Sequence, residues 1–336
     1  MLKVTMKDIA KNLNTSINTV SKALRNKDDV NQETKEQIIK EANRIGYNIH
    51  SVKNNNDAGS RACIGLVVPD CSNPFFAQII RSAQQTIETK NMMTLLCDTN
   101  ESYIKESNYI DTLIYEKIAG VLLCATQTHN EDIKKLKDSN TPFVLIGRFF
   151  EDIETDYVIS DDYDGSYQAT EHLLRLGHKN IVFINAKSYV SSAKYRLNGY
   201  LDAFKNHGIE VNPNYIKESE TTVESAYSVM KSIFLEGLEF TAVFAFCDLM
   251  LFGVYKAISE FGLSCPKDIS LVGFDNIFYS EIHSCPFTTI NQQKEKLGAI
   301  GAELLLEKII SGKKKLSHIT LPTELVIRES TSRINP

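Results

Sequence analysis

The chain has 336 residues, of which 43% are hydrophobic, and a net charge of −5 at pH 7. This length exceeds one ordinary hydrophobic core and predicts two or three domains, while no apolar run approaches the roughly 18 residues of a membrane-spanning helix. The seven cysteines and seven histidines show neither CxxC nor metal-ligand spacing. We therefore expect reduced thiols, no metal and no cofactor, and, without a signal-peptide-like start, a cytoplasmic protein.

The charge is distributed unevenly along the chain. Residues 1–60 carry a net charge of +3, and the remainder carries −8. A basic head on an acidic body indicates that only the head meets a polyanion such as nucleic acid.

Three short helices are predicted in this basic head. Thr5, Ser16 and Asn31 are suitable N-cap residues, and Asn14 suits a left-handed turn between the first two helices. We expect the third helix to end at Gly46. The apolar residues expected between the helices are Ile9, Ala10, Leu13, Val20, Ala23, Leu24, Ile38, Ile39, Ala42 and Ile45.

The second helix has a polar face that could contact DNA. Its outward residues are Ile17, Asn18, Ser21, Lys22 and Arg25. Small polar groups near a helix N-terminus can donate to phosphates or to base edges in the major groove. The alternative is an ordinary solvated face of a small helical bundle, since polar faces are common on surface helices.

A polar segment, NIHSVKNNNDAGSRAC, follows this head, and its composition is typical of a flexible linker. Beyond it, apolar strands alternate with amphipathic helices at 75–90, 162–176, 193–207 and 248–261. This alternation predicts parallel sheets covered on both faces, with too many strands for one sheet and so two side by side. The predicted strands are CIGLVVPD, MTLLCD, GVLLCA, FVLIG, YVIS, NIVFINA, TAVFAF, ISLVGFD and ELVIRE.

Polar residues follow several of these strands, where open parallel sheets bind ligands. Arg196 and Asp275 can each engage vicinal hydroxyls, which suits a polyhydroxylated ligand. For Asp162 and Asp248 we favour helix capping instead, because Asp is a preferred N-cap residue.

The basic head resembles the helix-turn-helix headpiece of the lactose-repressor (LacI/GalR) family. The resemblance rests on Ser16, the core Thr19-Val20-Ser21 and the closing Gly46-Tyr47. It implies that Ile17, Asn18 and Lys22 read bases. It also implies that Thr5, Ser16, Thr19, Ser21 and Asn31 contact phosphates. Two residues depart from the family pattern: Lys22 replaces Arg, which removes a bidentate fork, and Asn14 replaces a turn Gly.

The linker departs further from the family. Members place a hinge helix here, with a Pro, an Ala-Arg pair and a Leu that wedges into the minor groove. In this chain Ile49 occupies the position of the Pro, Lys53-Asn54 the position of the Ala-Arg pair, and Asn56 the position of the Leu. Val52 is therefore the remaining apolar candidate for the wedge. Asn cannot supply an apolar wedge, so the usual DNA kink is not expected.

The body also resembles this family, in its periplasmic-binding-protein-like effector domain. The segments that carry the resemblance are SNPFFAQII, ATEHLLRLGHKNIVFI, SSAKYRLNGYLDAF, DISLVGFDN and TTINQQKEKLG. It implies effector contacts by Phe75 or Phe76, Arg196 and Asp275, with Gln292 as a further candidate. Cys247 stands at a usual Asn, and Gly147 stands where some members have Asp. These smaller residues predict a roomier cleft, able to hold a disaccharide as well as a monosaccharide.

The resulting expectation is an α/β chain in three parts. These are an all-α helix-turn-helix headpiece (1–49), a hinge (50–61) and an effector-binding and dimerisation domain of two interleaved parallel-sheet subdomains (62–336). It would repress carbohydrate-use genes by binding a pseudo-palindromic operator as a homodimer. A tetramer is not expected, because no leucine-heptad tail follows Ser330. The alternatives are a sugar-binding module or an enzyme of the same fold. No nucleotide-binding or nucleophile-elbow motif favours an enzyme.

Overall fold

The computed structural model describes residues 5–24, 29–45, 47, 62–312 and 315–334. The chain divides into two compact units, Met1–Arg61 and Ala62–Pro336, which we call the helical unit and the α/β unit. The predicted linker residues Ile49, Val52, Lys53, Asn54 and Asn56 lie outside the described residues. Among the described residues, no helix has the length and apolar content to cross a lipid bilayer.

The helical unit contains the three predicted helices, α1 (Met6–Asn12), α2 (Ile17–Leu24) and α3 (Gln32–Arg44). Asn14 between α1 and α2 has a φ of 47°, in the left-handed region that Asn tolerates. Ile39 was expected inside but is 42% exposed, because it lies about 100° around the helix from the buried Ile38. Val30 is buried but precedes α3, so the helical periodicity did not reveal it.

Subdomain 1 of the α/β unit is a six-stranded parallel sheet with the order β11-β5-β4-β3-β1-β2. Helices α4 and α12 pack on one face, and α5 and α6 pack on the other. Its elements are β1 (Cys63–Val68), α4 (Pro74–Glu88), β2 (Met93–Asp98), α5 (Tyr103–Tyr115), β3 (Gly120–Leu123), α6 (Glu131–Asp138), β4 (Phe143–Ile146), β5 (Tyr157–Ser160), α12 (Lys294–Ser311) and β11 (His318–Leu321).

Subdomain 2 is a second six-stranded sheet with the order β12-β10-β9-β8-β6-β7. Helices α7 and α8 cover one face, and α9 and α10 cover the other. Its elements are α7 (Asp162–Arg175), β6 (Ile181–Asn185), α8 (Ser191–Asn206), a 3-10 turn (Pro213–Tyr215), β7 (Ile216–Glu218), α9 (Val223–Leu235), β8 (Ala242–Ala245), α10 (Asp248–Glu260), β9 (Ser270–Asp275), α11 (Phe278–Ile282), β10 (Thr288–Asn291) and β12 (Glu324–Val326).

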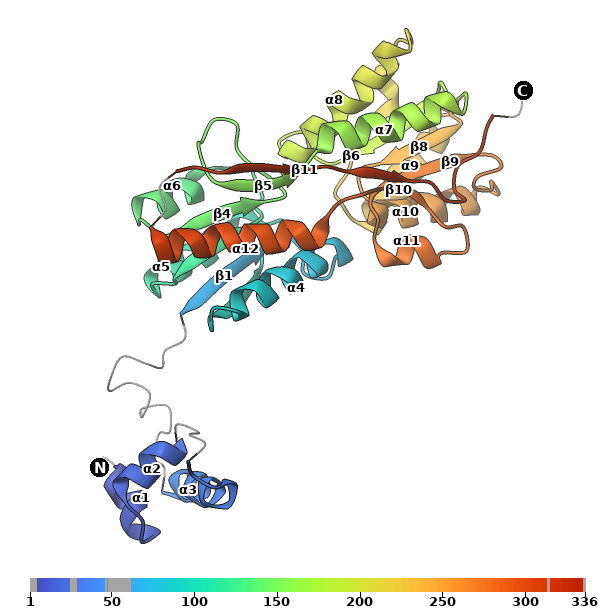
Figure 1. The fold of residues 1–336 in the computed structure, drawn as a ribbon. Coiled ribbons are helices and arrows are strands. Elements are labelled where there is room, and N and C mark those ends of the chain that lie inside the picture. Colours follow the sequence, from blue (N-terminus) through green and yellow to red (C-terminus); the bar gives the residue numbers. More distant parts are fainter. Residues whose placement is uncertain (1–4, 25–28, 46, 48–61, 313–314, 335–336) are drawn as a thin grey trace. The chain divides into compact units, whose positions relative to one another are not determined.

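The chain crosses between the two sheets repeatedly. It leaves β5 for α7, returns from β10 to α12, and passes from β11 to β12, the dark-red segment that runs along both subdomains in Figure 1. These crossings lie at the same edge of the two sheets, next to β5 and β11 in one and β10 and β12 in the other. The carboxyl ends of the remaining strands therefore face each other across a cleft.

The predicted class, a helical headpiece followed by two parallel-sheet subdomains, is confirmed, and each predicted strand is present. The ELVIRE strand was expected in a parallel sheet, but β12 pairs antiparallel with β10 because the chain enters it directly from a crossing. Strands β7, β10 and β11 were missed. Their sequences IKE, TTIN and HITL are short and partly polar, so they give no apolar run.

Candidate functional site

The N-terminus of α2 is an exposed polar surface. Ser16 is its N-cap, since the Ser16 Oγ accepts from the Thr19 backbone N–H at 3.0 Å and lies 2.8 Å from the Thr19 Oγ1. Ser16, Ile17 and Asn18 are exposed, and Ile17 keeps 44% of its surface accessible although it is apolar. Thr19 and Ser21 are half-buried. An exposed Ile beside polar groups at a helix N-terminus suits contact with a groove.

Lys22 lies on α2 in an ion pair. Its Nζ is 2.5 Å from the Asp29 Oδ2, and both side chains are about half exposed. An exposed pair of this kind contributes little to stability, so Lys22 can exchange its partner for DNA at small cost. Arg25, predicted on the same face, lies outside the described residues.

Thr5 and Asn31, both predicted phosphate contacts, are helix caps in the structure. The Thr5 backbone N–H donates to the Asp8 carboxylate at 2.7 Å, and the Asn31 Oδ1 accepts from the Thr34 N–H at 2.8 Å. Capping does not conflict with phosphate contact, because a helix N-terminus also presents free backbone N–H groups to an anion.

The second candidate site is a cleft between the two subdomains of the α/β unit, which we call the central cleft. It brings together all the predicted effector residues from α4, α8, the end of β9 and the crossing to α12. These residues are Phe75, Phe76, Arg196, Asp275 and Gln292. The Phe75 and Phe76 rings meet edge to face with centroids 5.0 Å apart. The structure therefore assembles the predicted set in one place, while the role of each residue stays a prediction.

Arg196 is buried in this cleft and is held by an ion pair and a backbone hydrogen bond. Its Nε donates to the Asp162 Oδ1 at 2.8 Å, and its Nη1 donates to the Phe246 carbonyl oxygen. The guanidinium also lies over the Phe246 and Phe274 rings, 4.1 and 3.6 Å from their centroids. A side chain held by an ion pair and two aromatic faces is pre-positioned to bind a ligand without further ordering.

Arg196 is held there by the close approach of α8 to α7. A Cβ added at Gly199 would lie 2.3 Å from the Tyr163 backbone oxygen, so a larger residue would push the two helices apart. This contact places Arg196 on α8 within reach of Asp162 at the start of α7.

Asp275, at the end of β9, lines the cleft from the same subdomain as Arg196. It is 4% exposed, and its Oδ1 accepts from the Gln292 Nε2 at 2.6 Å. Burial raises the pKa of Asp275 to about 7, although the nearby Arg196 acts to lower it. Its φ of 109° is strained for a non-glycine residue. The buried Lys294 ammonium donates to the Asp275 and Asn276 carbonyl oxygens and holds this strained segment.

The capping expected for Asp162 and Asp248 is wrong. Asp161 is the N-cap of α7, because its Oδ1 accepts from the Asp164 N–H, and this leaves Asp162 to pair with Arg196. Asp248 is fully buried and accepts from the Ile277 N–H, the Ser280 hydroxyl and the Thr289 hydroxyl. Burial raises the pKa of Asp248 to about 6. It ties the loop after β9 to α10 and does not line the cleft.

An ion pair between a buried Arg and a partly exposed Glu in the cleft was not predicted. Arg148 is 6% exposed and forms a bidentate contact with Glu101, at 2.6 and 3.0 Å, while its Nη1 also donates to the Ala125 carbonyl oxygen. Arg148 follows a strand, which sequence can reveal. Its partner is 47 positions away in the sequence, so no local pattern joins the two.

Hydrogen bonds also join the two subdomains at the rim of the cleft, and we call this set the clasp. The Gln127 Oε1 accepts from the Ser191 N–H at 2.9 Å, and the Phe149 N–H donates to the Ser191 Oγ at 3.2 Å. Nearby, the Glu151 carboxylate accepts from the Lys194 Nζ at 2.6 Å and from the Tyr195 hydroxyl at 3.1 Å. The clasp holds the subdomains in a closed arrangement.

The central cleft is smaller than expected. Its cavity measures about 40 Å³, which admits a few water molecules at most. Gly147 and Cys247 do line it, but the Arg148–Glu101 pair occupies space beside them and the clasp closes the rim. A sugar can enter only if the subdomains separate. The described residues contain no group of three His, Cys, Asp or Glu side chains that could hold a metal ion.

Comparison with known proteins covers both units. Residues 5–48 match the family described as bacterial regulatory proteins, lacI family, and residues 61–329 match periplasmic binding proteins and sugar binding domain of LacI family. The HTH-type transcriptional repressor PurR of Pasteurella multocida (strain Pm70) is 32% identical over 327 residues, 97% of this chain and 98% of the relative. The PurR repressor of Histophilus somni (strain 129Pt) is also 32% identical, over 98% of this chain and 99% of the relative.

Solved structures agree with this assignment. The transcriptional regulator CelR in complex with cellobiose has a TM-score of 0.75 at 25% identity and covers 97% of this chain and 99% of its own. A LacI family regulator from Enterococcus faecium with bound ribose has a TM-score of 0.73 at 28% identity, over 81% of this chain and 100% of its own. The lac repressor dimer bound to operator, at 22% identity and a TM-score of 0.78 over 98% of this chain and 99% of its own, shares the fold. The chain belongs to the LacI family of bacterial regulatory proteins.

Proposed function

We propose that this chain is a ligand-responsive repressor that binds operator DNA through its helical unit and a sugar through the central cleft. The observation that carries the proposal is the cleft itself, in which buried charged groups from both subdomains meet around a closed cavity. The relatives are transcriptional repressors, and two structural neighbours hold cellobiose or ribose. An enzyme is not favoured, and because the chain acts on operator DNA we assign it to the cytoplasm.

Operator reading is assigned to the exposed start of α2. Ile17 and Asn18 are exposed there, and Lys22 follows one turn later with a partner it can release. We assign Ile17, Asn18 and Lys22 to base edges. We assign Thr5, Ser16, Thr19, Ser21 and Asn31 to the DNA backbone, because these residues lie at or near helix N-termini whose N–H groups favour phosphate.

Sugar binding is assigned to Arg196, Asp275 and Gln292, with Phe75 or Phe76 packing on the sugar ring. Charged groups that each present two hydrogen-bonding atoms match vicinal hydroxyls, and an aromatic face matches the C–H side of a pyranose. A ligand shifts an equilibrium only by its differential affinity for the two states. A sugar that bridges the subdomains changes how far they are closed, and this change is the signal.

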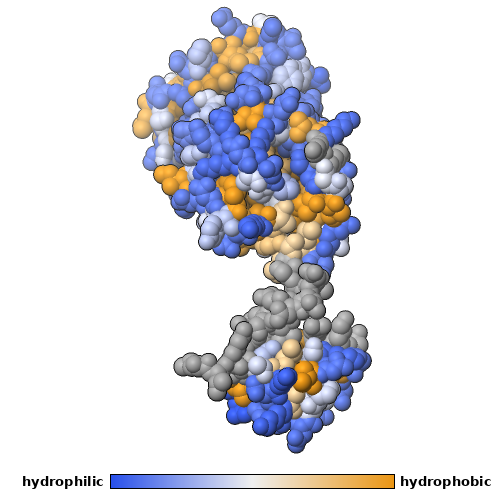
Figure 2. Space-filling view, turned by 90° about the vertical axis from the view of Figure 1, so that its left-hand side faces the viewer, coloured by the Kyte–Doolittle hydropathy of each residue, from blue (hydrophilic) through white to orange (hydrophobic). Residues whose placement is uncertain are grey.

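The protein is proposed to act as a homodimer through exposed apolar surface on the α/β unit. Figure 2 shows hydrophobic patches among hydrophilic residues on one face of this unit. Two exposed clusters lie on the edge strand β2, where Leu95 is 48% exposed, and on α11, where Phe278 and Ile282 are 61% and 60% exposed. An apolar edge strand is a liability in a monomer and is normally covered. Sedimentation should show a dimer, and Leu95→Asp should produce monomers.

Operator selection followed by binding titrations tests the proposal. The full chain is used to select sites from random duplex DNA, and binding is then measured with mono- and disaccharides and phosphosugars. We expect a pseudo-palindromic site and at least one sugar that alters its affinity. Exchange of Ile17 and Asn18 should change the selected sequence and leave non-specific affinity within a few fold. Binding that shows no sequence preference, or no response to any sugar, would contradict the proposal.

A further inference from the structure

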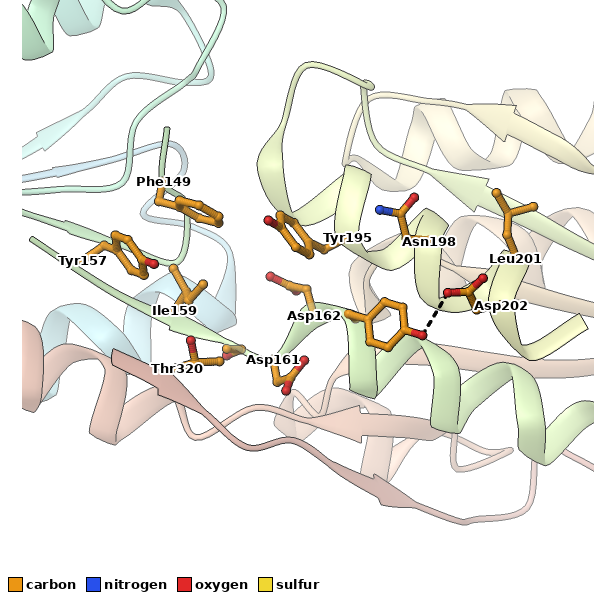
Figure 3. A pocket seen from close by; sticks show the side chains of 12 residues that line it. Phe149, Tyr157, Ile159, Asp161, Asp162, Tyr195, Asn198, Leu201, Asp202 and Thr320 are labelled. Atoms are coloured by element: carbon orange, nitrogen blue, oxygen red, sulfur yellow. Dashed lines mark hydrogen bonds between the residues drawn. The ribbon is translucent and has the colours of Figure 1, made fainter. Parts of the chain in front are cut away.

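A second cavity lies beside the central cleft, at the crossing from β5 to α7, and we call it the crossover pocket. It measures about 570 Å³ and shares no lining residue with the central cleft. Small-molecule sites in proteins typically measure about 300–1,000 Å³. In Figure 3, residues of subdomain 1 such as Phe149 and Tyr157 face residues of α8 in subdomain 2 such as Tyr195 and Asp202 across the pocket. Unlike the central cleft, this cavity is large enough to hold a ligand without a movement of the subdomains.

Aromatic rings form one side of the crossover pocket. The Phe149 ring centroid is 4.7 Å from that of Tyr157 and 5.7 Å from that of Tyr195. Tyr195 comes from subdomain 2, so the cluster joins the two subdomains. The Tyr157 ring also stacks on His318, with 4.4 Å between the ring centroids. The negative π faces of Phe149 and Tyr195 attract cations.

Carboxylates form another side. Asp161, Asp162 and Asp202 line the pocket, and no Lys, Arg or His is among its lining residues. The hydrogen bonds to Asp161 and to Asp202 each end on a single oxygen, with the Asp164 N–H and the Tyr163 hydroxyl as donors. Within the described chain, no donor reaches the other oxygen of either carboxylate. The pocket therefore offers acceptors and negative potential, which disfavour a phosphorylated or carboxylated ligand.

We propose that the crossover pocket binds a small organic cation. An alkylammonium group lies against Phe149 and Tyr195, with the Asp161 and Asp202 carboxylates around it. A neutral sugar would use the rings and the acceptors, but it would gain nothing from a lining that has several carboxylates and no cationic side chain.

Binding here is coupled to the central cleft through Asp162. This residue lines the crossover pocket and also holds Arg196 in the central cleft. The pocket walls come from both subdomains, so an occupant favours the arrangement in which they are together. By linkage, the cation and the cleft ligand then change each other's affinity by the same factor.

Calorimetry on the full chain tests the proposal with choline and with its neutral isostere 3,3-dimethylbutan-1-ol. We expect choline to bind at least tenfold more tightly than the isostere, and more weakly as salt rises. Binding of both compounds with equal affinity, or no choline binding up to 10 mM, would overturn the proposal.

Variants locate the site. Asp202→Asn and Tyr195→Leu should each weaken choline binding at least tenfold. Tyr195→Phe should bind like the unmodified protein, because it keeps the ring and loses only the contact to Glu151. Asp164→Asn is the matched control, since Asp164 lies on α7 outside the lining of the pocket. If Asp164→Asn weakens binding as much as Asp202→Asn, the general charge of the region and not this pocket binds choline, and the assignment is wrong.

Discussion

The helix caps of the helical unit join residues that are close in the sequence, whereas the ion pairs of the central cleft join residues that are far apart in the sequence. In the helical unit, Thr5 pairs with Asp8 and Ser16 with Thr19, each three positions apart. In the cleft, Arg196 reaches Asp162 across 34 positions, and Arg148 reaches Glu101 across 47. The first contacts are a property of short helices and their caps, and the second exist only when both sheets are complete. Their variants should therefore fail in different ways.

The largest expected effect is the loss of a buried charge. Arg196→Met should lower the free energy of unfolding of the α/β unit by about 3–5 kcal/mol, because it leaves the buried Asp162 carboxylate unpaired. Arg175→Ala, in an exposed pair with Glu171, should cost well under 1 kcal/mol. Urea unfolding followed by circular dichroism measures both.

A double variant sharpens this test. Arg196→Met combined with Asp162→Leu removes both charges and should recover most of the lost stability while the ligand response stays absent. If Arg196→Met alone is as stable as Arg175→Ala, the buried pair of Arg196 and Asp162 does not stabilise the cleft more than an exposed ion pair would.

The pH dependence of stability should separate the two regions next. Burial raises the pKa of Asp275 from the ordinary value of an aspartate to about 7, so the folded state holds a proton that the unfolded state releases. This contribution is fully present below pH 4 and is lost as the pH rises to 7. The stability of the unmodified protein relative to Asp275→Asn should fall across this window, by up to about 1.4 kcal/mol per pH unit. A difference that is flat with pH would mean that Asp275 is ionised in the folded protein.

Lys22→Ala should affect DNA binding by an intermediate amount. We expect a loss of about 1–3 kcal/mol on the selected operator and a much smaller loss on random duplex, because a base contact is lost only where the base is present. Lys40→Ala on the exposed face of α3 is the control and should change neither. Fluorescence anisotropy at fixed salt measures both affinities. Equal losses of affinity on both DNAs would make Lys22 a phosphate contact.

The smallest expected effect is local. Ser16→Ala should destabilise α2 by about 1 kcal/mol through loss of the cap to the Thr19 N–H, whereas Ser16→Asn, another good N-cap, should nearly preserve it. Hydrogen exchange of the α2 amides in the full chain reports this change without disturbing the α/β unit. Altered exchange in the α/β unit would show that the helical unit is not as self-contained as its contacts indicate.

The features that could be predicted from the sequence are mainly those whose interacting residues lie close together in the chain. The caps Thr5, Ser16 and Asn31 are readable because their partners lie within one helical turn. Arg196 and Asp275 were predicted to share a cleft because Asp275 ends a strand of a recognisable pattern and the resemblance to a family marked both residues. The roles of Asp162 and Asp248 were misjudged, because a carboxylate at the start of a helix looks the same in sequence whether it caps the helix or reaches a distant partner.

The sequence by itself determined the helical headpiece and the alternation of strands and helices, and it predicted which polar residues meet in the central cleft. Hydrophobic periodicity and cap chemistry act over a few residues, so they leave a local record in the chain. Only the tertiary structure decided that Arg148 pairs with Glu101, that the clasp closes the central cleft to about 40 Å³, and that a roomier pocket opens beside it. These features arise where two sheets meet, and contacts between segments distant in sequence leave no periodic pattern in either segment.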